Sequence, residues 1–82
     1  MPVSGVVLTC VAEHVDDIAL RVATVDGVEV HGVLPDGRIV AVLEAETVDG
    51  EVALVTELQD IEDVISVQMA YHNFEDLEAE RP

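Results

Sequence analysis

The spacing of apolar residues alternates between two periods along this 82-residue chain, and that alternation limits the folds open to it. Period-two segments rich in β-branched residues predict strands, because successive side chains of a strand point to opposite faces. Apolar residues at helical spacing predict amphipathic helices. In chain order we expect a strand over 3–11, a helix over 14–25, strands over 28–33 and 39–45, a second helix after residue 47, and a strand over 64–72.

Local signals mark where these elements begin and end. Asp26-Gly27 ends the first helix. Pro35-Asp36-Gly37-Arg38 predicts a tight turn, because proline presets φ and glycine accepts a positive φ. Thr47 is the predicted N-cap of the second helix. The apolar stripe of that helix is predicted to comprise Val52, Leu54, Val55, Leu58 and Ile61.

The order strand, helix, strand, strand, helix, strand predicts the split βαβ arrangement, a ferredoxin-like α+β fold. Right-handed crossovers place both helices on one face of a four-stranded antiparallel sheet, with the first and third strands in the centre. The length leaves little room for a second core, so we expect a single domain over 1–73. The acidic segment 74–82 is expected to be a frayed tail.

Strand alternation assigns each residue to one face of this sheet. The helix-facing set is almost purely apolar: Val6, Leu8, Cys10, Val28, Val30, Ile39, Ala41, Leu43, Ile65, Val67, Met69 and Tyr71. The opposite set is mixed: Val7, Thr9, Val11, Glu29, His31, Val33, Val40, Val42, Glu44, Ser66, Gln68, Ala70 and His72. The second face therefore presents valines within a rim of acidic and polar side chains, and no helix is expected to cover it.

The charge of the chain narrows the partners that such a face can take. Eighteen acidic residues against three arginines and no lysine give a net charge of −15, which argues against nucleic acid and anionic membranes. An apolar patch inside an acidic rim favours an amphipathic or hydrophobic helix that carries basic residues. Two alternatives stay open, since a dimer partner could cover the face and the acidity could be an adaptation to high salt.

The residues that catalysis or metal binding would need are scarce. The single cysteine, Cys10, is predicted to be buried and inert. The three histidines, His14, His31 and His72, have no metal-ligand spacing. We therefore predict a binding protein that is not an enzyme and that uses neither cofactor nor metal. The apolar runs are shorter than the roughly 20 residues of a membrane span, and the N-terminus lacks a basic signal region, which predicts a cytoplasmic location.

Several local features, taken together in their order, resemble the NapD family over about residues 3–72. They are Gly5-Val6-Val7-Leu8, then Glu13, Val15, Asp17 and Ile18, then Gly27-Val28-Glu29-Val30, the turn Pro35-x-Gly37, Glu44-Ala45-Glu46, and finally Val64-Ile65, Val67, Met69 and Tyr71-His72. The resemblance implies a cytoplasmic chaperone for the periplasmic nitrate reductase catalytic subunit. Such a protein binds the twin-arginine signal peptide of the precursor as a helix on the open sheet face and delays export until the molybdenum cofactor is inserted.

The resemblance and the face assignment together predict the contact residues. Val7, Thr9, Val40, Val42 and Gln68 would form the platform for the peptide, while Glu29 and Glu44 would attract its two arginines. The alternative function is a small-ligand-binding regulatory domain of the same fold, of the ACT kind. Those domains have a glycine-rich turn between the first strand and the first helix, which this sequence lacks at Ala12-Glu13-His14.

Overall fold

The structure is a computed structural model that describes residues 2–73, with side chains described for residues 2–70. All six predicted elements are present in the predicted order, with a short 3-10 turn at Ala12–His14 before the first helix. They are β1 (Val3–Cys10), α1 (Val15–Ala23), β2 (Val28–Val33), β3 (Arg38–Glu44), α2 (Val48–Gln59) and β4 (Val64–Asn73). The predicted tail, 74–82, lies outside the described residues.

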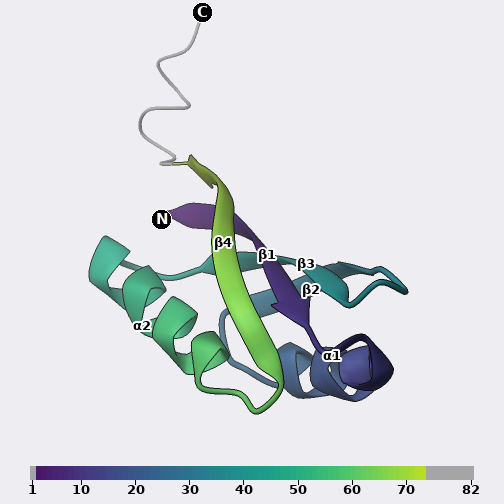
Figure 1. The fold of residues 1–82 in the computed structure, drawn as a ribbon. Helices are drawn as coiled ribbons and strands as arrows, with labels where there is room; N and C mark the ends of the chain where they lie inside the picture. Colours follow the sequence, from purple (N-terminus) through teal and green to yellow (C-terminus); the bar gives the residue numbers. More distant parts are fainter. Residues whose placement is uncertain (1, 74–82) are drawn as a thin grey trace, which may run out of the picture.

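The four strands form one antiparallel sheet in the order β2-β3-β1-β4, which confirms the ferredoxin-like α+β prediction with β1 and β3 in the centre. Both helices lie on the same side of this sheet (Figure 1). Helix α1 packs mainly against β2, and α2 packs mainly against β4. The opposite side, which we call the outer sheet face, carries neither helix (Figure 1).

The hydrophobic core lies between the sheet and the two helices. Strand residues that were predicted to face the helices fill its centre, since Leu8, Ile39 and Leu43 are completely buried. Helix α1 contributes Val15, Ile18, Ala19 and Val22, which are spaced i, i+3, i+4 and i+7 along one face. The burial of these side chains removes apolar surface from water and so orients the helix on the sheet.

Helix α2 begins as predicted but presents a different stripe to the core. The Thr47 hydroxyl oxygen accepts a hydrogen bond from the Gly50 backbone N–H at 3.0 Å, which confirms the N-cap. Leu58 is completely buried, and Leu54 packs against the core. Val52 was predicted to belong to this stripe, but 58% of it is exposed, so that prediction is wrong. Glu51 takes the core-facing position instead, because it lies three residues before Leu54 and seven before Leu58.

A hydrogen bond accounts for the burial of this glutamate. The Ser4 hydroxyl, at the start of β1, donates to Glu51 Oε1 in α2. Both residues are buried. A carboxylate removed from water needs such partners to offset its lost hydration. The contact therefore joins the first strand to the second helix.

Bulges in β2 and β4 interrupt the predicted alternation. In β4, Val64 pairs with Cys10 and Ser66 with Thr9, so Ile65 has no partner in the ladder. Val64 therefore packs against the core, while Ile65 is 67% exposed, and its predicted inward placement is wrong. An extra residue in a bulge reverses the alternation between the residues before it and those after it, so Val64 faces the core while Ser66 faces outward as predicted.

A bulge at His31 in β2 changes the face of a residue that follows it. Val33 pairs with the buried Ile39 and thus lies on the helix side, although it was predicted to face outward. Met69 lies on the helix side as predicted, opposite Val6, but the edge position of β4 leaves it half exposed. The predicted placements of Tyr71 and His72 concern side chains outside the described residues.

The turn between β2 and β3 has the predicted geometry. Gly37 has a φ of +101°, and its N–H donates to the Leu34 carbonyl oxygen at 3.1 Å. The Leu34 N–H donates to the Arg38 carbonyl oxygen at 2.8 Å and closes the hairpin. The hairpin sets the register of β2 against β3 and thereby the positions of the outward residues on both strands.

Candidate functional site: the outer sheet face

The centre of the outer sheet face is apolar and spans three strands. Val7 of β1 lies directly between Val40 of β3 and Gln68 of β4. Side chains of residues that pair across antiparallel strands point to the same face, so these three form one row. Val7 is half-buried, whereas Val40 and Gln68 are exposed. The row offers a platform for an apolar partner.

Three predicted site residues meet at one corner of this face. Glu29 of β2 pairs with Val42 of β3, and Glu44 follows two residues later on the same side of β3. Together with Gly27 and Val28 they line a shallow hollow of about 250 Å³. Both carboxylates are exposed and flank a half-buried valine. The hollow can therefore receive a cation attached to an apolar segment.

Glu29 also contacts His31. The sequence predicted that His31 lies on this face but did not include it among the contact residues. The His31 Nε2 and Glu29 Oε1 atoms are 2.8 Å apart. Both side chains are largely exposed, so the pair contributes at most about 1 kcal/mol to stability. A cationic ligand can replace such a weak contact at Glu29.

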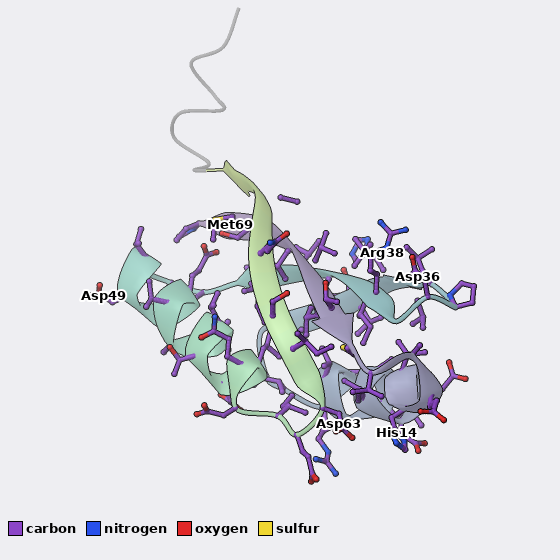
Figure 2. All side chains as sticks on the ribbon, in the orientation of Figure 1. His14, Asp36, Arg38, Asp49, Asp63 and Met69 are labelled. Atoms are coloured by element: carbon purple, nitrogen blue, oxygen red, sulfur yellow. The ribbon has the colours of Figure 1, made fainter. Side chains whose placement is uncertain are left out.

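The opposite end of the face carries an ion pair between Arg38 and Asp36, which the sequence reading missed. Thr9 pairs with Arg38 at the first position of β3, so Arg38 shares the outward side with Val40. Its Nε donates to Asp36 Oδ2 at 2.9 Å, and the two side chains lie together at the tip of the hairpin (Figure 2). The predicted strand began at residue 39, whereas β3 begins at Arg38. A start one residue earlier would have placed Arg38 on the outward side with Val40 and Val42, because alternate residues of a strand share a face.

All seven predicted site residues thus lie on the outer sheet face. The structure brings Glu29, Val42 and Glu44 together in the hollow, and Val7, Val40 and Gln68 together in the central row. Thr9 lies apart from the two carboxylates, beside Arg38 and Ser66. The face accordingly has an acidic corner, an apolar centre and an Arg38–Asp36 ion pair at its other end.

Among the described residues, the cysteine and the candidate metal ligands do not form a second site. Cys10 is buried, and burial raises the pKa of its thiol above the ordinary 9.0, which suppresses the reactive thiolate. Within the described residues, no three His, Cys, Asp or Glu side chains are placed to hold one metal ion. None of the described helices has the length and apolar character that crossing a membrane requires.

Comparisons with known proteins agree with this architecture. The solution structure of the E. coli Tat proofreading chaperone protein NapD superposes with a TM-score of 0.81 at 27% sequence identity, covering 98% of this chain and 85% of that one. No curated protein matches the sequence. A family model described as NapD protein matches residues 1–76, which is nearly the whole chain. The chain therefore belongs to the NapD family.

Proposed function

We propose that this protein binds the twin-arginine signal peptide of an exported precursor on its outer sheet face. The observation that carries the proposal is the hollow in which two exposed carboxylates, Glu29 and Glu44, flank Val42 beside an apolar platform. We further propose that the client is the periplasmic nitrate reductase precursor and that binding delays its export until its cofactor is inserted. Support comes from the similarity to a Tat proofreading chaperone.

The NapD family consists of non-enzymatic chaperones, so the protein works by reversible binding and makes or breaks no bond. A signal peptide must be held before it crosses the membrane. The proposal therefore implies a cytoplasmic location. The small-ligand alternative gains no support from the described residues, because the link from β1 to α1 is a 3-10 turn without glycine.

The charges of the face favour one direction for the bound peptide. Arginine guanidinium groups form strong, planar, bidentate contacts with carboxylates, so the arginine pair would lie at Glu29 and Glu44. The hydrophobic segment that follows would then cross Val42, Val7 and Val40 toward the hairpin. The opposite direction would place the arginines at the hairpin, where the Asp36 carboxylate is already paired with Arg38.

The required affinity is compatible with these contacts. A micromolar dissociation constant corresponds to roughly 8 kcal/mol. Burial of apolar side chains on the valine platform contributes roughly 25 cal/mol for each Å² removed from water. The charged contacts add about 1.5–3 kcal/mol each where they are well formed. Two such contacts fall short of the required free energy, so the apolar segment supplies the remainder, and the arginines supply selectivity.

Calorimetric titration tests the proposal. The ligand is a synthetic twin-arginine signal peptide from a nitrate reductase precursor, and its control has both arginines replaced by glutamine. We expect Glu29→Gln and Glu44→Gln each to weaken binding of the arginine peptide about tenfold or more. Glu62→Gln, which removes the same charge from an exposed loop position, is expected to leave the affinity unchanged.

A double-mutant cycle separates direct contact from general electrostatic attraction. If Glu29 pairs with an arginine, the losses from Glu29→Gln and from the glutamine peptide will not add. Equal affinity for the two peptides would refute the proposal. Absence of binding at moderate and at molar salt would point to a different client or to acidity that serves only as an adaptation to salt.

A further inference from the structure

We propose that α2 and the helix-facing side of β4 form a second docking surface, which binds a basic amphipathic helix of a partner protein. The two elements enclose a groove of about 490 Å³. Its lining is Val48, Glu51, Val52, Val55, Thr56, Gln59 and Met69. We call this feature the α2–β4 groove. Its volume lies within the roughly 300–1,000 Å³ of protein ligand pockets.

The walls of the groove carry apolar side chains that stay exposed to solvent. Val48 is 44% exposed, Val52 58% and Met69 51%, and all three line the same groove. In Figure 2, Met69 lies on the half of β4 nearest the chain end and Asp49 lies in the first turn of α2. Apolar patches rimmed by polar residues commonly mark interaction sites.

The groove is separate from the outer sheet face. Met69 pairs with Val6, a buried residue on the helix side of β1, whereas Val7 points outward. The two surfaces therefore lie on opposite sides of the sheet. A partner in the α2–β4 groove would leave Glu29, Glu44 and the valine platform accessible, so both surfaces can be occupied at once.

Charge decides which kind of partner fits. The exposed acids beside the groove are Asp49 in the first turn of α2 and Asp60 at its end, and the helix contains no lysine or arginine. An apolar groove with such a rim favours a segment whose apolar side chains enter the groove while lysines or arginines meet the acids. Apolar residues at helical spacing with basic residues between them have that character.

A helix suits the groove better than an added strand. Strand β4 is an edge of the sheet, but Ile65 and Ala70 are both left out of its ladder with β1. Such bulges interrupt the straight row of backbone groups that an added strand needs, and they protect edges from pairing. The groove instead offers side chains, which a helix contacts through one face.

Two other occupants are disfavoured by charge. A second copy would bring an equally acidic α2 against the groove, and each chain carries a net charge of −15. The chain's own segment 74–82 contains Glu75, Asp76, Glu78 and Glu80 against one arginine. Like charges repel across either contact, so a cationic partner complements the groove best.

An NMR titration of the full-length, 15N-labelled protein tests this proposal. The probe is a synthetic helical peptide of about 16 residues, with leucines at i, i+3, i+4 and i+7 and lysines on its other face. A peptide of the same composition in scrambled order is the control. We expect the helical peptide to shift the amides of 48–59 and Met69, and the scrambled peptide to bind at least tenfold more weakly.

Matched variants locate the contact. Val52→Lys places a cation in the groove and should weaken binding of the helical peptide about tenfold or more. Leu20→Lys makes the same kind of change at a 70% exposed position on α1 and should have no effect. Because both positions are exposed, both variants are expected to keep the wild-type amide spectrum elsewhere. Binding of the signal peptide should be unaffected by Val52→Lys.

Several results would overturn the proposal. One is that the helical peptide shifts only the amides of Val7, Val40 and Val42. Another is that the scrambled peptide binds as tightly as the helical peptide. Displacement of the probe by the signal peptide would make the groove part of the first site. A dimer in sedimentation that Val52→Lys dissociates would identify a second copy as the occupant. Shifts of the groove amides on deletion of 74–82, without peptide, would identify the chain's own tail.

Discussion

Replacement of Gly37 by alanine is expected to destabilise the protein through the β2–β3 hairpin. Gly37 has a φ of +101°, a conformation that costs a side-chain-bearing residue about 1–2 kcal/mol. A Cβ at this position would overlap the Cys10 carbonyl oxygen and would lie 3.2 Å from Ala12 Cα. Both neighbours are backbone atoms, so no flexible side chain can move aside.

The magnitude follows from three contributions. Relief of the overlap separates Gly37 from β1 and weakens the bond that the Cys10 N–H donates to the Gly37 carbonyl oxygen at 2.8 Å. That bond contributes about 0.5–1.5 kcal/mol. Alanine lowers the entropy of the unfolded chain, which offsets about 0.4–1 kcal/mol. The net loss is about 1–3 kcal/mol, or roughly 5–20 °C in Tm for a domain of this size.

Urea and thermal unfolding followed by circular dichroism measure this loss, and the same hairpin supplies a control. Gly32 has an ordinary strand conformation, and a Cβ there would meet only Val40 Cβ, at 4.0 Å. Gly32→Ala should therefore be neutral or stabilise by up to about 1 kcal/mol. If Gly37→Ala unfolds at the wild-type midpoint, or if both variants lose the same stability, the argument from φ and overlap is wrong.

Four other predictions concern the core, the second helix, the buried thiol and the surface charge. Leu58→Ala should cost about 2–5 kcal/mol in urea unfolding because Leu58 is completely buried, whereas a loss below about 1 kcal/mol would contradict that placement. Thr47→Ala removes the N-cap acceptor for the Gly50 N–H and should lower the unfolding free energy by about 1 kcal/mol. If Thr47 were only a solvent-exposed side chain without this bond, the substitution would leave the unfolding free energy unchanged. Burial raises the pKa of the Cys10 thiol in the folded state. The contribution of this thiol to folding stability is therefore intact below the ordinary thiol pKa of 9.0 and is lost as pH rises above it. The stability of wild type should therefore fall more steeply than that of Cys10→Ala in that alkaline range, and parallel pH profiles would refute the assignment. Sodium chloride should raise the Tm between low and physiological ionic strength, because screening relieves repulsion within a chain of net charge −15, and a falling Tm would contradict this.

The sequence by itself determined the order of elements and the centre of the sheet. The periods of the apolar residues, the turn at Pro35 to Gly37 and the cap at Thr47 are local signals, and local backbone preferences act within a few residues. The inward residues of β1 and β3 were likewise predictable, because their mutual ladder is unbroken over Val3 to Thr9. An unbroken ladder preserves strict alternation, which also placed Glu29, Val42 and Glu44 on one face.

Only the tertiary structure decided the features that depend on what each element meets. The bulges at His31 and Ile65 arise from pairing with neighbouring strands, and they moved Val33 and Ile65 to faces that alternation did not predict. Glu51 could enter the core because Ser4, distant in sequence, supplies a hydrogen bond there. With Glu51 in that position, Val52 is exposed on the wall of the α2–β4 groove. Such placements depend on contacts between segments far apart in the chain, which periodicity within one segment cannot specify.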